Sequence, residues 1–573
     1  MRSGAEYFTE PSSAPQRRYE ALRAYLVEGL SAAEAGRRCG YSQATIYQMA
    51  RELRAGRAEF FRSSKPGPKG PRKAAAVRTR VLELRAADRS VTEIAVALDA
   101  EGAPVSHQTV FEILRAEGLE RLPRRAAAER GAPARTPPVK ARSLGAWPAP
   151  ASIPCEHAGL YLLAPAIVKL GLPELLAGAR YPGTSVLSAF QSLGSLLLLK
   201  LARRARRSHA HRLASDPGLG LYLGLAAPPK ATHLTSYSYR VRREANEALL
   251  RALAARLREL ELVTGEQGFN VDFHAIRHHG EEASLERNYV PSRSQATRSV
   301  LAFFAQDHAS REMVYANADV TKAERATEIL RFCEFWRGLS GADPDPLVLD
   351  SQLTTYAVLS ELSALGIGWL TLRKRGKAEL ARLAERPDSD WQRVRIERSG
   401  RYRRPHLLDE VVEIKGIDHP VRQIAARNIG REEPTLLIAN DRERDAKELF
   451  ARYAERMLIE NELAAYISGF HLDALSSGLA LNVDLDTTLT VLAGAVYRLF
   501  AGNLPRFERA TPARLHDDFV NAAGRLEVSD QGVTVALATK TYTPVLLEAG
   551  FAELEVEVPW WEGRQLRFSF PPR

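Results

Sequence analysis

Three residues near position 455 have the types and the spacing of a chemical site. Tyr453, Arg456 and Glu460 are three and four residues apart, so on one α-helix their side chains share a face. Upstream, Asp272 in Phe-Asn-Val-Asp-Phe-His and Asp350 in Pro-Leu-Val-Leu-Asp-Ser-Gln each follow a short apolar run that predicts a strand. Three carboxylates in the order strand, strand, helix indicate two-metal chemistry on phosphodiester bonds.

Residues of these types also have ordinary structural uses. A single Asp at a strand end more often serves a turn, and a Tyr/Arg/Glu trio on a helix more often forms surface ion pairs. Asp484 and Asp486 alternate out of a short apolar run that predicts a strand, which makes them the alternatives for the third ligand. Asp343 and Asp345 flank prolines and are expected in a loop. The carboxylate order, the strand context and the helix spacing together favour the first set.

Charge is unevenly distributed along the 573 residues. Residues 1–150 contain 26 Lys and Arg against 16 Asp and Glu, a net of +10, whereas the whole chain carries +11. A basic amino-terminal region followed by a nearly neutral remainder predicts that the amino-terminal region binds a polyanion, and DNA is the expected one. The three cysteines form no C-x-x-C pair, which argues against a zinc cluster, and no signal or membrane-spanning pattern is found, so a cytoplasmic, nucleoid-associated protein without a membrane partner is expected.

The basic front contains two helical units. In residues 17–60, Ser31 is placed to cap a helix over Ala32–Cys39, Gly40 ends it, and Ser42 caps the next helix from Gln43. In residues 77–120, a helix over Val77–Ala87 is followed by a capping box at Ser90 and by a helix capped by Ser106. A short helix, a turn and a second helix predict helix-turn-helix domains.

Polar residues on the second helix of each unit are the candidates for contact with DNA. The Pro- and Gly-rich basic linker 61–76 between the units is either a solvated linker or an arm in the minor groove. Gln can pair with adenine and Arg with guanine. The predicted DNA-binding residues are Gln43, Thr45, Gln48, Arg51, Lys69, Arg72, His107, Gln108 and Arg115.

The body of the chain changes from helical to mixed patterns. After a linker at 121–155, residues 156–266 predict a helical domain, in which a Leu-rich helix ends in Arg203-Arg-Ala-Arg-Arg. From 267, three strands, a helix, a strand, a helix and a strand describe an α/β sheet of mixed direction. Residues 376–434 alternate as β-strands and interrupt this core, which comprises 267–375 and 435–505. Residues 506–573 predict a β-rich region.

With these motifs in place, the chain resembles the DDE transposases of bacterial insertion sequences. The closest group carries a Tyr-x-x-Arg-x-x-x-Glu signature and a β insertion between the second Asp and the Glu. In this chain residues 453–460 match the signature, and the segment 376–434 lies where the insertion would be. The resemblance covers roughly residues 230–500. It implies an α/β RNase H-like catalytic core with an all-β insertion, preceded by two all-α helix-turn-helix domains.

The resemblance also implies roles for the candidate residues. Asp272 at the first strand, Asp350 at the fourth and Glu460 would be the catalytic, metal-binding carboxylates, with Tyr453 and Arg456 as supporting neighbours. The cofactor would be two Mg²⁺ ions, for which Mn²⁺ can substitute. The partners would be double-stranded DNA, namely terminal inverted repeats and target DNA, and a second copy of the chain in a homodimer.

One position departs from the family pattern. The family often has Lys seven residues after the Glu, where this chain has Ile467. Arg452, Arg456 or His471 could supply that charge. Two alternatives to an active transposase therefore stay open: a transposase-derived DNA-binding regulator without catalysis, and a metal-dependent nuclease that cuts without joining.

Overall fold

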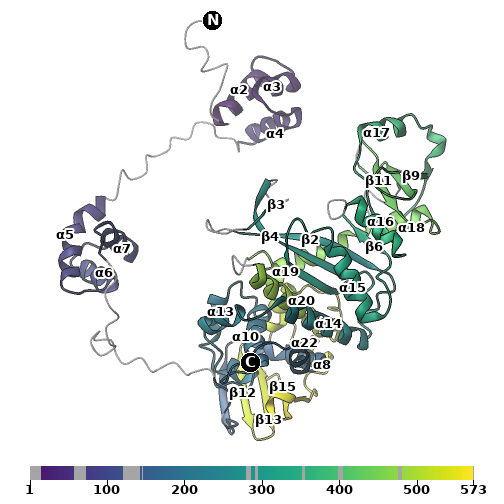
Figure 1. The fold of residues 1–573 in the computed structure, drawn as a ribbon. Coiled ribbons are helices and arrows are strands. Elements are labelled where there is room, and N and C mark those ends of the chain that lie inside the picture. Colours follow the sequence, from purple (N-terminus) through teal and green to yellow (C-terminus); the bar gives the residue numbers. More distant parts are fainter. Residues whose placement is uncertain are drawn as a thin grey trace. The chain divides into compact units, whose positions relative to one another are not determined.

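The computed structural model describes residues 14–56, 72–119, 142–144, 146–278, 285–290, 295–350, 355–397, 404–430, 432–474 and 480–571. The chain divides into two compact units, Met1–Thr136 and Pro137–Arg573. Mixed α/β content with large mixed sheets characterises the second unit, whereas the described part of the first is helical. Figure 1 shows the elements of both units.

The first unit contains two groups of three helices, each with its own small core. The Ser31 side chain accepts from the Glu34 amide in a capping box, and Ser42 caps the following helix, so both predicted caps are confirmed. Ser90 and Ser106 cap the later helices as predicted. The helices are α2 (Ala14–Leu26), α3 (Ala32–Cys39), α4 (Gln43–Arg54), α5 (Arg72–Ala86), α6 (Val91–Ala100) and α7 (His107–Ala116).

The start of α5 corrects the predicted basic linker. The composition of 61–76 predicts a linker over its whole length, but residues 72–76 form the first turns of α5. Ala74, Ala75 and Ala76 are strong helix formers, and the last proline of the linker lies before them at Pro71. Lys69 and the side chain of Arg72 lie outside the described part of the chain.

The second unit is built on a sheet of ten strands with mixed direction. Its described order is β3-β4-β2-β6-β7-β11-β10-β9-β8, with β5 paired to β4. The long strand β4 is buried over its second half because helices cover both sheet faces. The first strands are β2 (Phe269–Arg277), β3 (Arg287–Val290), β4 (Gln295–Asp307), β5 (Met313–Val320), β6 (Leu347–Leu349) and β7 (Trp369–Leu372).

Helices that pack on this part of the sheet include α14 (Arg243–Glu259), α15 (Glu328–Ser340), whose Phe332 contacts Phe269 and Phe303, and α20 (Ala480–Gly502). The helix α20 packs on β5 and α14 and is buried on nearly all sides, as an apolar helix must be. It begins at Ala480, so the strand expected around Val483 is wrong. A short apolar run is compatible with a buried helix as well as with a strand. Here the run is helical because α20 is packed against other elements on nearly all sides.

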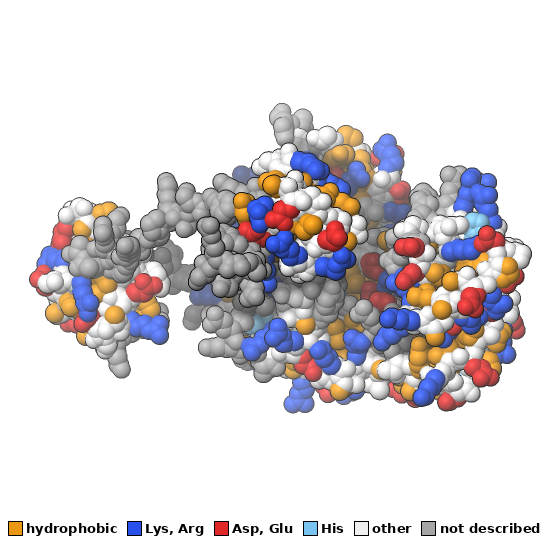
Figure 2. Space-filling model, turned by 90° about the horizontal axis from the view of Figure 1, so that it is seen from above, with side chains coloured by type: hydrophobic (Ala, Val, Ile, Leu, Met, Phe, Trp, Pro, Cys, Tyr) orange, Lys and Arg blue, Asp and Glu red, His pale blue; other side chains and the backbone are white. Residues whose placement is uncertain are grey.

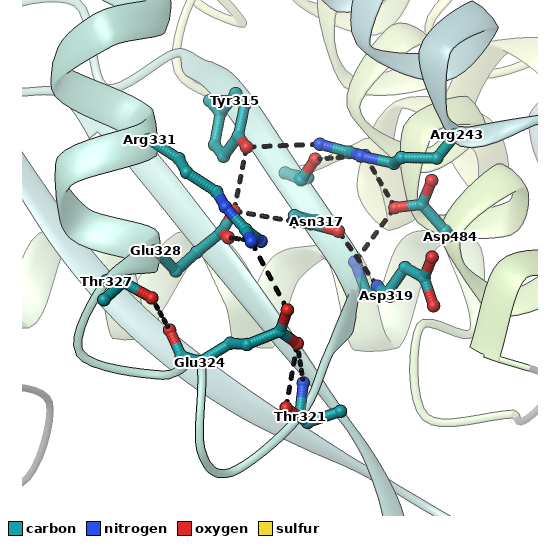
Figure 3. A network of polar contacts seen from close by, with 12 residues as sticks. Arg243, Tyr315, Asn317, Asp319, Thr321, Glu324, Thr327, Glu328, Arg331 and Asp484 are labelled. Atoms are coloured by element: carbon teal, nitrogen blue, oxygen red, sulfur yellow. Dashed lines mark hydrogen bonds and ion pairs between the residues drawn. The ribbon is translucent and has the colours of Figure 1, made fainter.

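A buried polar network joins these elements (Figure 3). The fully buried Asp484 pairs with Arg243 at 2.8 Å and accepts hydrogen bonds from Asn246 Nδ2 and the Ala318 amide. Tyr315 and Asn317 of β5 donate to the buried Glu328 of α15. Because its oxygens are already engaged, Asp484 is unsuited to be the alternative third metal ligand.

The predicted β insertion extends the same sheet. Strand β11 (Thr435–Ala439) pairs antiparallel with β7, and β10 (Val421–Arg427), β9 (His406–Val412) and β8 (Gln392–Arg393) follow. Two expectations need correction. The segment 376–434 is not all-β, since it contains the helix α17 (Lys377–Ala384) with Leu383 buried. The alternating pattern also predicts a strand over Val411–Ile417, but the strand found there, β9, lies earlier because Leu407 and Leu408 provide the buried face.

Residues 156–266 are helical as predicted. They comprise η2 (Ala158–Leu163), α8 (Ala164–Leu170), α9 (Leu172–Gly178), α10 (Ala189–Leu201), η3 (Arg207–His209), α11 (Ala210–Leu213), α12 (Pro217–Tyr222), α13 (Ala231–Ser238) and α14. Among the described helices no single one is long and apolar enough to cross a membrane, although the bent pair Ala158–Leu170 and Leu172–Gly178 passes by length and composition. Basic and acidic side chains are interspersed on the face shown in Figure 2.

A second sheet joins the two ends of this unit. Strand β1 (Ala151–Cys155), in the segment predicted to be a linker, pairs antiparallel with β12 (Gly524–Ser529). The order is β1-β12-β13-β15-β14, with β13 at Gly532–Leu537, β14 at Val556–Val558 and β15 at Arg564–Ser569. The carboxy-terminal region also contains α21 (Pro512–Leu515), a π-helical turn at His516–Val520, α22 (Thr543–Glu548) and η8 (Pro559–Trp561). Trp560 and Trp561 donate to backbone carbonyls at the end of α12, which fixes this sheet on the helical region.

A buried carboxyl group near this core predicts a pH-dependent stability. Burial, followed by the charge of Glu462, raises the pKa of Glu312 from 4.5 to about 8. The folded chain therefore keeps this proton where the unfolded chain has lost it, and stability falls as pH rises from about 4.5 to 8. We expect Glu312→Gln to flatten this dependence and to raise the free energy of unfolding at pH 8 by roughly 1–3 kcal/mol.

Urea denaturation at pH 5, 6.5 and 8 measures this effect. The exposed Glu562→Gln provides the control and should leave the pH dependence unchanged. A variant that is less stable than the parent at pH 8 would show that the ion pair of Glu312 with Arg498, at 3.2 Å, outweighs the cost of burial.

Candidate active site

The two predicted aspartates lie on neighbouring strands, but Asp272 is within β2, which continues to Arg277, and only Asp350 follows the end of its strand, β6. Strands β2 and β6 are parallel, and Val271 is the register partner of Leu349. Asp272 follows Val271 within β2, and Asp350 follows Leu349 directly after β6, so the two aspartates lie at the same level of the sheet. Gly268 has φ +71°, and a Cβ there would collide with the carbonyl oxygen of Pro346. Glycine thus lets β2 start close to β6, which sets this register.

The third carboxylate comes from a broken helix, not from a single one. The expectation that Tyr453, Arg456 and Glu460 share one helix face is wrong: α18 (Ala446–Ala454) contains Tyr453, and α19 (Met457–Phe470) begins after Arg456. The Arg456 amide bonds to the Tyr453 carbonyl and the Ile459 amide to the Arg456 carbonyl, a tighter turn than in an α-helix.

The break has a packing cause. Leu449 and Phe450 of α18 belong to the small core formed with β7 and β11. Ile459 and Leu463 of α19 belong to the main core of the unit. The two halves of the segment therefore bury their apolar faces in different cores, and the chain bends between them. The segment contains no Gly or Pro at this point, so the sequence carries no local signal of the break.

Arg456 nevertheless brings the signature residues to the aspartates. Its Nη2 lies 2.5 Å from Glu460 Oε1, and its Nη1 lies 3.5 Å from Asp272 Oδ2. The pKa of Asp272 is raised to about 6, mainly by burial; Arg456 acts against this rise, and the charges of Asp350 and Glu460 add to it. The three carboxylates thus act on one another electrostatically and form one acidic cluster around a guanidinium.

The donor set can be tested against the ion that the family resemblance implies. Carboxylate oxygens are the ligands that Mg²⁺ prefers, and Asp272 and Asp350 offer them from adjacent strands. Arg456 lies between Asp272 and Glu460, and in the described ranges no three His, Cys, Asp or Glu side chains are arranged to hold a metal. The Arg456 Nη1 is buried without a hydrogen bond. The donor types fit Mg²⁺, provided that Glu460, which is 44% exposed, exchanges Arg456 for the ion.

The remaining residues near the carboxylates have defined contacts. Burial raises the pKa of Tyr453 above its ordinary value, with Arg456 acting in the opposite direction. Arg452 donates to Asn270 on β2 at 2.7 Å, and His274 pairs with Asp473 at 2.6 Å. Ile467, where the family often has Lys, packs against the main core. Of the three residues considered as substitutes for that Lys, Arg456 is the one that contacts two of the carboxylates.

The predicted DNA-contact residues of α4 and α7 lie on solvent-facing positions. Gln43, Gln48, Arg51, His107, Gln108 and Arg115 are exposed, and Thr45 is half-buried. Two of them already bond within their helix: Gln48 donates to Glu52 and Gln108 to Glu112. Val110, Ile113 and Leu114 are buried on the opposite side of α7, as predicted.

Comparisons with known proteins give little beyond this geometry. No family model and no curated protein sequence matches the chain. A cryo-EM structure of a piggyBac transposase synaptic complex with hairpin DNA is similar over 61% of this chain and 78% of that chain, with 10% sequence identity and a TM-score of 0.34. A score this low does not establish a shared fold, so the similarity adds no weight to the candidate site.

Proposed function

We propose that this chain is a DDE-type transposase that cleaves and joins DNA strands with Mg²⁺. The observation that carries the proposal is the pairing of β2 with β6, which brings Asp272 and Asp350 together beside Arg456 and Glu460. The RNase H-like fold inferred from the sequence requires its first and fourth strands to be neighbours. Here β2 is the first strand, and β6 is the fourth when the short strand β3, which pairs only with β4, is not counted. The segment 376–434 would be the family insertion.

The proposed chemistry is an in-line displacement at phosphorus. Asp272, Asp350 and Glu460 would hold two Mg²⁺ ions, or Mn²⁺ in their place, which activate the attacking oxygen and stabilise the leaving oxygen. Asp272 and Asp350 are fixed by the sheet, whereas Glu460 is exposed enough at the surface to change partner. Arg456, when it releases Glu460, can hold a phosphate oxygen of the substrate. Because the Glu460 side chain is exposed to solvent, a DNA strand could reach it from outside the protein.

The basic amino-terminal unit would bind the ends of the element. In this proposal α3–α4 and α6–α7 are helix-turn-helix domains that contact the inverted repeats, and a homodimer brings two ends together in the cell's nucleoid. The capped helices and their exposed polar faces support this role. Target DNA would meet the carboxylate cluster.

A plasmid assay tests the proposal and separates it from the alternatives. Supercoiled plasmid carrying the DNA that flanks the gene is incubated with the full chain and Mg²⁺, and nicked, cut and joined products are resolved. Cleavage with strand transfer supports a transposase. Cleavage without joining identifies a nuclease, and tight binding to the ends without cleavage identifies a regulator.

The proposed recognition helices give a separate prediction. We expect Arg51→Ala in α4 and Arg115→Ala in α7 each to weaken binding to the element's ends by about 1–3 kcal/mol, because an Arg on a base edge supplies that discrimination. Fluorescence anisotropy on end DNA and on scrambled DNA measures the difference. Arg37→Ala, an exposed Arg on α3, is the control and should affect both DNAs equally. Equal losses on both DNAs for Arg51→Ala and Arg115→Ala would contradict base readout.

A further inference from the structure

A basic cavity lies apart from the carboxylate cluster. It has a volume of about 310 Å³, at the lower end of the range for small-molecule sites. Its walls come from four places in the sequence: η2, the end of α10, the end of α19 and the π-helical turn after α21. The lining residues are His157, Leu160, Ala202, Arg203, Arg204, His471, His516, Val520 and Asn521.

The cavity has two arginines and three histidines but, among its described lining residues, no carboxylate. Arg203 pairs with Asp517 at 2.8 Å, and this aspartate is 61% exposed, so water screens the pair. Arg204 makes no ion pair with any described residue and instead bonds to His157 Nε2 at 2.9 Å. The other ring nitrogen of His157 donates to Asp216, so Nε2 accepts the hydrogen bond from Arg204. This neutral acceptor does not compensate the positive charge of Arg204.

Both arginines also have donors without partners. The Nε atoms of Arg203 and Arg204 are buried and make no hydrogen bond. A buried donor without a partner costs about 1–3 kcal/mol, so two of them in adjacent residues of one cavity call for an explanation. An anion with several acceptor oxygens in the cavity would balance the charge of both guanidinium groups, and a rotation of either side chain would let its Nε donate to the anion as well.

The surroundings of the cavity are positive as well. Arg206 and Arg212 follow in the same segment, are exposed and make no ion pair with a described residue. Burial lowers the pKa of His516, and Arg203 and Arg204 lower it further while Asp517 acts in the opposite direction. The pKa of His209 is likewise lowered by burial and then by Arg212 and Arg204. Burial is the largest cause of the lowered pKa at both His516 and His209, and Arg204 acts in the same direction at each.

We infer that this cavity binds a phosphate group through Arg203 and Arg204. Planar guanidinium groups bind phosphate oxygens in pairs, and His157 holds the Arg204 side chain in place for such a contact. The same phosphate chemistry can come from two sources: the backbone of bound DNA or a free phosphate ion. The inference rests on the cavity alone and does not require the carboxylate cluster to be catalytic.

The cavity and the carboxylates lie at opposite ends of α19. Glu460 is in its first turn, and His471 is its C-terminal cap. His471 comes eleven residues after Glu460, which corresponds to about 16 Å along the helix. A phosphate in the cavity is therefore a different phosphate from the one that reacts.

Arg204→Gln is the variant that tests the inference, and Arg212→Gln is its matched control. Both remove one positive charge from the same segment, but only Arg204 lines the cavity. Arg203 is left unchanged because its contacts with Asp517 and the Ser468 carbonyl contribute to the fold. The melting temperatures without ligand show whether each variant is folded.

The first arm uses inorganic phosphate. The melting temperature of the full chain is measured as phosphate is added at constant ionic strength, with chloride as the reference anion. If the cavity takes free phosphate, the parent and Arg212→Gln should be stabilised in proportion to the logarithm of phosphate concentration above Kd, and Arg204→Gln should not.

The second arm uses a duplex of about 30 base pairs without the element's ends. Binding is measured by anisotropy from about 50 to 200 mM salt, and the slope of log K against log salt counts the phosphates contacted. If the cavity takes a DNA phosphate, Arg204→Gln should lower the slope by about 1 and Arg212→Gln should not.

Either selective loss supports the inference and identifies the source of the phosphate. If Arg204→Gln behaves as the parent in both arms, or if Arg212→Gln has the same effect as Arg204→Gln, the cavity is not a phosphate site and the inference fails. Neither arm measures cleavage, so this result is independent of whether the proposed transposase activity is found.

Discussion

Replacing Asp272 with Asn is expected to lower Mg²⁺-dependent DNA cleavage by about 10³-fold or more, since a metal ion contributes several kcal/mol to the transition state and about 1.36 kcal/mol corresponds to tenfold in rate. Asp350→Asn should have an effect of the same order, because the two residues lie at the same level of adjacent strands. The rate is measured on supercoiled plasmid carrying the flanking DNA, with binding to end DNA measured in parallel. End binding should be unchanged, because it is assigned to the amino-terminal unit.

The Asp272→Asn variant can be distinguished from one that has lost its fold. Burial raises the pKa of Asp272 to about 6, so at pH 7.5 the folded chain carries a charge that the site disfavours. Asn removes this charge, and the variant should therefore be at least as stable as the parent at pH 7.5 in the absence of metal. Lost cleavage together with retained stability would assign the effect to the site.

Glu460→Gln provides the test of the third carboxylate. We expect it to lower cleavage to a similar degree, and Glu455→Gln is the matched control. Glu455 lies five residues earlier, is 48% exposed and pairs with His308, away from the carboxylate cluster. If Glu460→Gln and Glu455→Gln cleave equally well, Glu460 is not a ligand. Retained cleavage in all three carboxylate variants would refute the whole site assignment.

Asp484→Ala is expected to lower the free energy of unfolding by about 3–5 kcal/mol, because it leaves a buried charge without its partner. Arg243 would lose its ion pair (Figure 3). Asn246 and the Ala318 amide would lose their acceptor. Urea denaturation monitored by circular dichroism measures the loss. The midpoint should fall while binding of end DNA by the amino-terminal unit persists at low urea.

The control for Asp484→Ala is Asp388→Ala. Asp388 also pairs with an arginine, Arg427, but it is 91% exposed, and such pairs contribute about 0–1 kcal/mol. Asp484→Asn, which keeps the size of the side chain and one acceptor, should lie between the two. A loss for Asp484→Ala no larger than for Asp388→Ala would show that water reaches Arg243 and that the network stabilises less than its burial indicates.

Local sequence determined many of the elements that position the site. The caps Ser31, Ser42, Ser90 and Ser106 are predictable because a side-chain oxygen, a short spacing and the backbone amides are enough to start a helix. The strands Thr435–Ala439 and Leu347–Leu349 are short apolar runs between turn residues, and such runs are local signals that a sequence carries by itself.

Other features depend on contacts between distant residues. The bend between Tyr453 and Met457 arises because α18 and α19 pack into different cores, and strand β1 exists because β12, some 370 residues later, supplies its partner. The run Val483-Asp-Leu-Asp is helical because α20 is buried on nearly all sides. The basic cavity has no local signal beyond the run Arg203-Arg-Ala-Arg-Arg, since its histidines come from three separate segments.

The sequence by itself thus determined which residues could form a metal site: three carboxylates with their strand and helix contexts and a signature spacing. Only the tertiary structure decided that Asp272 and Asp350 are neighbours and that Arg456 holds Glu460 beside them. Residue type and local spacing are encoded within a few positions, whereas the pairing of β2 with β6 depends on burying the whole sheet between helices.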